Sequence, residues 1–138
     1  MRKTMAIKVL GFSILLLSLT GQLWAKKFPL AASPKAPAAS GEVNASTDKN
    51  GNTTIELKVS HLAKPGNLTP PATVYVVWFQ QQGQTPTKQG ELKVDGKLNG
   101  DLKASTTMKN FDVWITAESD PNVNNPNGDE VLRTTVQM

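Results

Sequence analysis

The chain has 138 residues and a net charge of +4, and this length is enough for one domain. It contains no cysteine, which excludes disulfides, thiolate metal sites and a lipid-anchored cysteine. Six of the 15 basic residues precede residue 41, which leaves nine in residues 41–138 against all 11 acidic ones. Because a nucleic-acid-binding domain needs a basic surface, this distribution argues against a nucleic-acid partner.

Residues 1–25 have the pattern of a signal peptide. A basic start is followed by an apolar run from Val9 to Leu19, and the segment ends at Ala25, as in cleavable leaders. The run is shorter than the roughly 20 apolar residues of a membrane-spanning helix. We expect a signal-peptide helix cleaved after Ala25 and a periplasmic or secreted domain. The alternatives are cleavage after Ala32, or an uncleaved signal anchor that tethers the domain to the inner membrane.

Residues 26–40 are rich in proline and alanine. Segments of this composition run extended and act as semi-rigid spacers. The sequence therefore predicts a linker over 26–40 and a folded domain over 41–138.

From residue 41 onward the apolar residues alternate with period two, which indicates strands. Turn signals such as Asn50-Gly51 and Asp95-Gly96 separate the alternating segments. The pattern predicts an all-β, seven-stranded antiparallel β-sandwich of immunoglobulin-like or cupredoxin-like type. The expected strands are 41–47, 54–60, 73–81, 90–95, 97–105, 110–118 and 130–137.

If each strand crosses the domain once, successive loops lie at alternate ends of the domain. The turns near Asp48, Gly83 and Met108 are expected at one end. The long loops 61–72 and 119–129 are expected at the other, together with the Asp95-Gly96 turn.

Several short motifs appear in a fixed order along the domain. They are Val59-Ser-His-Leu-Ala-Lys-Pro65, Val74-Tyr-Val-Val-Trp78, Gly90-Glu-Leu92, Phe111-Asp-Val-Trp-Ile-Thr-Ala-Glu118 and Pro126-Asn-Gly128. In this order they resemble the extracytoplasmic domain of anti-sigma-K factor proteins. The resemblance implies a sandwich fold, a place outside the cytoplasmic membrane and a sensing or binding role. Since eight residues precede the apolar run, we expect a stand-alone exported domain without that family's cytoplasmic sigma-binding part.

Three aromatic residues are the candidate binding surface. Tyr75 and Phe79 alternate with Trp78 along one strand, and Trp114 projects from the polar side of another. If these strands are neighbours, Tyr75, Phe79 and Trp114 form an outward aromatic patch, which is typical of binding surfaces. The alternative is that the linker, a loop or the C-terminus covers them.

Two oxygen-rich loops are candidate cation sites. Asp48, Asn50 and Asn52 lie in one, and Asp120 and Asp129 lie in the other. The first lacks the distal glutamate of an EF-hand, and an Asx-type hairpin turn is its alternative. A solvated loop is the alternative for the second, and the strand count puts the two loops at opposite ends.

The single histidine, His61, provides neither a copper site nor a recognisable catalytic triad. We therefore expect no cofactor and no catalysis. The sequence favours an exported binding or sensing module of the cell envelope, with a protein, peptide or envelope polymer as partner. The alternatives are a structural or assembly component of the envelope and, less favoured, an enzyme that uses the long-loop end.

Overall fold

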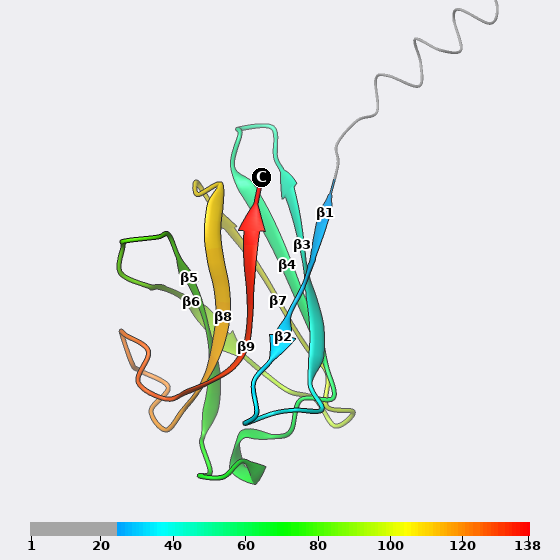
Figure 1. The fold of residues 1–138 in the computed structure, drawn as a ribbon, viewed down its shortest axis with the longest axis vertical. Helices are drawn as coiled ribbons and strands as arrows, with labels where there is room; N and C mark the ends of the chain where they lie inside the picture. The colour runs from blue at the N-terminus through cyan, green and yellow to red at the C-terminus, as the bar shows by residue number, and fades with distance from the viewer. Residues whose placement is uncertain (1–24) are drawn as a thin grey trace, which may run out of the picture.

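The structure is a computed structural model that describes residues 25–138 (Figure 1). The expected leader, residues 1–24 of it, lies outside the described residues. Among residues 25–138, no helix is long and apolar enough to span a membrane. The strands are β1 (Lys26–Pro29), β2 (Ala31–Ala32), β3 (Ser40–Thr47), β4 (Thr53–Ser60), β5 (Val74–Gln80), β6 (Thr87–Leu92), β7 (Gly100–Thr106), β8 (Asn110–Glu118) and β9 (Asp129–Gln137), with one 3-10 turn at Pro65–Asn67.

The strands form two antiparallel sheets, which confirms the all-β prediction. One sheet has the order β1-β3-β4-β7 and the other the order β2-β9-β8-β5-β6. Their inner faces contribute to a single apolar cluster, so the sheets pack face to face as in a β-sandwich. Buried members of this cluster include Val43, Ile55 and Leu57 from one sheet and Tyr75, Val77, Phe79, Val113 and Ile115 from the other.

The strand count of seven is wrong, because the segment expected as a linker adds two strands. β1 pairs with β3 at the edge of one sheet, and β2 pairs with β9 at the edge of the other. Leu30 lies between β1 and β2 and is buried, as are Ala36 and Ala39. Proline is tolerated here because it lies at strand ends and sheet edges, where its missing N–H removes no ladder bond. Residues 26–40 therefore close one side of the sandwich.

The observed bounds of two strands also differ from the expected ones. Strand 90–95 is observed as β6 at Thr87–Leu92, and strand 97–105 as β7 at Gly100–Thr106. The carboxylate of Asp95 accepts the backbone N–H groups of Lys97 at 2.8 Å and Asn99 at 3.0 Å. The turn therefore extends from Asp95 to Asn99 instead of being a tight Asp-Gly turn.

The expected grouping of the loops is confirmed at both ends. At one end, Thr53 at the β3–β4 turn donates its hydroxyl to the carbonyl of Met108 at 2.8 Å. At the other end, the N–H of Thr73, which follows loop 61–72, donates to the carbonyl of Glu118, which precedes loop 119–129, at 2.9 Å. In Figure 1 the first end lies near the C-terminus and the second carries the 3-10 turn.

A Leu30→Ala substitution tests whether the N-terminal segment is part of the sandwich. Removing a buried leucine side chain leaves a cavity, so the free energy of unfolding should fall by about 2–3 kcal/mol. Chemical denaturation of the full chain measures this loss. Ala31→Ser, at an exposed neighbour, is the control and should change stability little. Equal stabilities for the two variants would mean that the segment is a free spacer.

Candidate functional site

The expected aromatic patch does not form, because Tyr75 and Phe79 face the core. Both are fully buried in the cluster between the sheets. The Phe79 ring lies 5.0 Å from the ring of Phe111, and the Tyr75 hydroxyl donates to the carbonyl of Ala63 at 2.5 Å. Trp114 projects from the opposite face of the sheet, so the three aromatic residues do not share one surface.

The outer face of β5 is apolar as well, and it is covered. Val76 and Trp78 are fully buried there, packed against Trp114 and Val123. Trp78 lies directly opposite Trp114 in the β5–β8 register. Because Val123 belongs to the β8–β9 loop, that loop folds back over the outer face of the five-stranded sheet.

A chain of hydrogen bonds attaches this loop to the sheet. The indole N–H of Trp78 donates to the hydroxyl of Thr116 at 2.8 Å, and that hydroxyl donates to the carboxylate of Glu118 at 2.5 Å. The same carboxylate oxygen accepts the N–H groups of Asn127 at 3.2 Å and Gly128 at 3.1 Å. Glu118 is buried, and these hydrogen bonds satisfy its carboxyl group, as a buried polar group requires.

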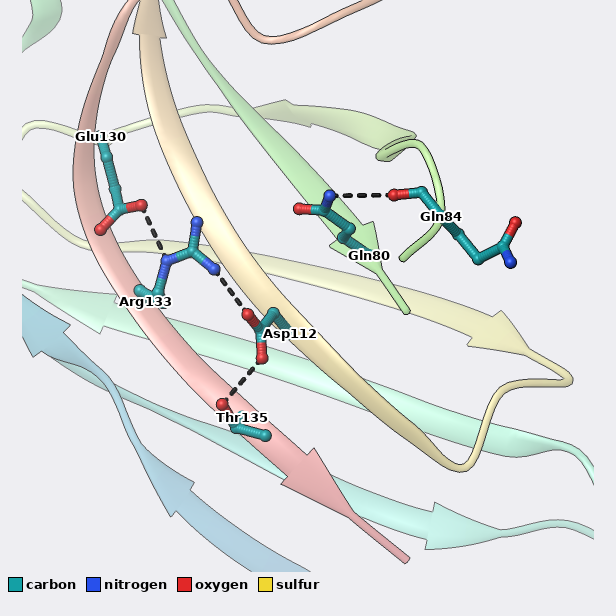
Figure 2. Close-up of polar contacts among 6 residues, drawn as sticks. All are labelled: Gln80, Gln84, Asp112, Glu130, Arg133 and Thr135. Atoms are coloured by element: carbon teal, nitrogen blue, oxygen red, sulfur yellow. Dashed lines mark hydrogen bonds and ion pairs between the residues drawn. The ribbon is translucent and has the colours of Figure 1, made fainter. Parts of the chain in front are cut away.

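On the same face of the sheet, Arg133 of β9 lies between Glu130 and Asp112, as Figure 2 shows. Its guanidinium lies over the Trp114 ring, 4.5 Å from the centroid, in cation–π geometry. It donates to the carboxylates of Asp112 at 2.7 Å and Glu130 at 2.8 Å, and Thr135 donates to Asp112 at 2.8 Å. These contacts join β8 and β9 and hold each polar group in one position.

A groove of about 440 Å³ continues from this network toward the β5–β6 loop. Asp112 and Thr135 are shared between the network and the groove. The side chain of Gln80 lines the groove and donates to the carbonyl of Gln84 at 2.9 Å, which holds the loop beside the sheet (Figure 2). The groove is of a size that small ligands or parts of polymers occupy.

The candidate cation loops are organised by hydrogen bonds and one ion pair. The carboxylate of Asp48 accepts the N–H groups of Asn50 and Asn52, each at 2.9 Å, which is an Asx turn. Asp120 accepts the N–H of Asn122 at 2.9 Å. Asp129 lies 3.6 Å from the ammonium group of Lys35.

Two further observations concern metal and catalytic chemistry. Among residues 25–138 there is no group of three or more His, Cys, Asp or Glu side chains placed to hold a metal ion. His61 is exposed just after β4 and lines a pocket of about 560 Å³ together with Pro34 and Leu68. Asp120 and Asp129 are not among its lining residues, so the pocket does not join His61 to either carboxylate.

Sequence reasoning placed Trp114 on the outer face but missed Asp112 and Arg133. Asp112 lies two residues before Trp114 in β8, so strand alternation predicts that both side chains point to the same outer face. Arg133 lies opposite Trp114 only through the β8–β9 register. That register contains an irregularity between Ile115 and Thr116. The alternation of residues along either strand does not predict this irregularity.

No family model, curated protein or solved structure matches the chain in comparisons with known proteins. The geometry of the face is therefore the basis for the functional argument.

The burial of Tyr75 can be tested by titration of its phenol. Tyr75 is the only tyrosine in the sequence, so the tyrosinate absorbance reports on this residue alone. Burial raises the pKa of its phenol to about 12, against about 10 in water. Absorbance titration of tyrosinate in the native protein should show that raised midpoint. In denaturant the midpoint should return to about 10. A native midpoint near 10 would mean that the phenol meets water.

The same shift predicts how stability depends on pH. Below pH 10 the phenol is protonated in both the folded and the unfolded state, so Tyr75 adds no slope. Between about 10 and about 12 the unfolded state loses its proton first, and the free energy of unfolding falls. The Tyr75→Phe variant should lack this part of the decline when denaturation is followed against pH.

A Thr116→Val substitution tests the chain of hydrogen bonds beneath the loop. It leaves the Trp78 indole N–H and the Glu118 carboxylate each without one partner, so stability should fall by about 1–3 kcal/mol. Thr135→Val makes the same change at an exposed position of the same face and should cost no more than about 0.5 kcal/mol. Chemical denaturation of both variants measures the two losses of stability. Equal losses in the two variants would contradict the structural role of Thr116.

Proposed function

We propose that the protein is an exported, non-catalytic binding or sensing module of the cell envelope, and that it recognises its ligand through the outer face of the five-stranded sheet. This recognition face consists of Trp114, Arg133, Asp112 and Thr135 with the adjoining groove. The observation that carries the proposal is the fixed position of Arg133. It stacks on Trp114 and is bound by two carboxylates, an arrangement that a merely solvated sheet face does not require.

The indole N–H of Trp114 adds support. Its nitrogen is buried, and no residue of the described chain accepts a hydrogen bond from it. A buried donor without an acceptor costs about 1–3 kcal/mol, and such groups in native proteins call for an explanation such as a water or a ligand. Its position beside Arg133 favours a binding role for this face.

The export part of the proposal rests on the N-terminal pattern. The described fold begins with β1 at Lys26, immediately after the expected cleavage position. A cut after Ala25 would therefore release a chain that starts in a strand, whereas a cut after Ala32 would remove β1 and β2. This supports cleavage after Ala25. The resemblance to anti-sigma-K extracytoplasmic domains remains a prediction that agrees with this location.

We also infer that the sandwich is of the immunoglobulin-like type. In that fold the strands A, B and E face the strands G, F, C and C′. The order β3-β4-β7 opposite β9-β8-β5-β6 supports this assignment, with β1 and β2 as an N-terminal addition.

The double variant Asp112→Ala, Arg133→Ala tests the recognition face. It removes one charge of each sign, so the net charge of the face is unchanged, while the partly exposed Glu130 loses its ion-pair partner. Immobilised full-length protein should retain a component of an envelope extract, and the variant should retain it about tenfold more weakly, the equivalent of ~1.4 kcal/mol. Binding of fractionated envelope protein and polysaccharide, measured separately, gives the readout.

The outer face of the other sheet supplies a matched control. Glu56 and Lys103 form an ion pair of 3.5 Å there, and the variant Glu56→Ala, Lys103→Ala makes the same change in charge. It should retain the component as the parent does, and both variants should unfold cooperatively. Equal retention by the two double variants would show that the recognition face is the wrong surface.

A further inference from the structure

The groove beside the recognition face has an unusual lining for a protein surface that is rich in lysine and acidic residues. Six uncharged hydrogen-bonding residues line it, namely Gln80, Gln81, Gln82, Asn110, Thr135 and Gln137. Each amide carries donors and an acceptor on one planar group, and the threonine hydroxyl does both. A ligand that fits this lining must offer donors and acceptors in close alternation.

Among the described residues, those that line the groove offer no free positive charge. Asp112 is the one charged side chain in this lining. Arg133 lies 2.7 Å from that carboxylate and also pairs with Glu130, so the network beside the groove carries one net negative charge. Because like charges repel, the groove favours a neutral ligand over an anion.

The position of the groove on a sheet face argues against an extended peptide. β8 is paired on one side with β5 and on the other with β9, so its backbone groups are not free to add a strand. Peptide side chains would also need apolar pockets, but Phe111, an apolar residue of the lining, is almost completely buried. Side-chain amides, a hydroxyl and an ion-paired carboxylate are left to make the contacts.

The polar groups at the centre are already fixed in place. Asp112 accepts from Arg133 at 2.7 Å and from Thr135 at 2.8 Å, and Gln80 is held by Gln84. Contacts with Asp112, Thr135 and Gln80 therefore order few additional side chains, which lowers their entropic cost. Vicinal hydroxyl groups, which donate and accept at a fixed spacing, match such planar groups.

Resting on the proposed function, we infer that the ligand of this groove is a neutral oligosaccharide, bound by its hydroxyl groups to the groove side chains. The structure points to a segment of a polysaccharide that crosses the ends of β5, β8 and β9.

Heteronuclear NMR on the full chain tests this inference with defined probes. The neutral probes are hexasaccharides of β-1,4-linked glucose and N-acetylglucosamine, and the anionic probe is hexagalacturonate. The indole N–H of Trp114, assigned with a Trp114→Phe variant, and the glutamine side-chain amides report binding. At least one neutral probe should give saturable shifts at these groups, and hexagalacturonate should bind more weakly.

Asn110 and Gln137 lie directly opposite each other across β8 and β9, and both are exposed. The variant Asn110→Ala, Gln137→Ala should lower the affinity for the neutral probe about tenfold, equivalent to ~1.4 kcal/mol. Asn124→Ala, Asn125→Ala removes two exposed amides from the β8–β9 loop and should leave the affinity unchanged.

Three outcomes overturn the inference. Tighter binding of hexagalacturonate would contradict the argument from charge, and unchanged affinity of the Asn110→Ala, Gln137→Ala variant would place the sugar elsewhere. If no neutral probe binds, the ligand class is wrong. In that case the envelope retention of the Asp112→Ala, Arg133→Ala variant separates the two proposals. Weakened retention would support the proposed binding face with a different class of ligand. Unchanged retention would contradict both the binding face and the oligosaccharide.

Discussion

β5 carries apolar side chains on both faces, so its register against β8 decides which of them enter the core. Trp78 lies opposite Trp114, and strand alternation then directs Tyr75 and Phe79 inward. The same pairing leaves Trp78 on the outside, where a sheet face would normally meet water. The β8–β9 loop covers it there, and Glu118 attaches that loop through two backbone N–H groups. One pairing thus determines both the core and the shape of the outer surface.

The cover divides the outer face into two parts with different properties. Next to the loop, Val76 and Trp78 are sealed from solvent as a small second core. Further along β8 and β9, the guanidinium of Arg133 lies over the Trp114 ring. Since Asp112 binds the same guanidinium, the polar surface that borders the groove is supported from below by aromatic packing. The recognition face therefore depends on the register even though its own groups are polar.

The sequence predicts the seven main strands well, because segments such as Thr53–Ser60 alternate with few exceptions. It fails at residues 26–40, where Phe28 and Leu30 are the apolar signal and the prolines indicate a spacer. The composition does not show that an edge strand tolerates proline. The site is harder to predict than the fold. Alternation gives two equal choices for a strand that is apolar on both faces, and only packing against β8 and the loop selects between Tyr75 and Trp78.

The change from an aromatic patch to a polar face also changes the kind of recognition that is expected. An exposed cluster of aromatic rings would bind by burying apolar area, and a single contact of that kind can be strong. Hydrogen bonds to amides and hydroxyls contribute only about 0.5–1.5 kcal/mol each, so one site of this type binds weakly. A repeating ligand offers one groove many equivalent units along its chain, which raises the number of ways in which that groove can bind. A groove such as that beside Asp112 is therefore better suited to a repeating polymer than to a single small molecule.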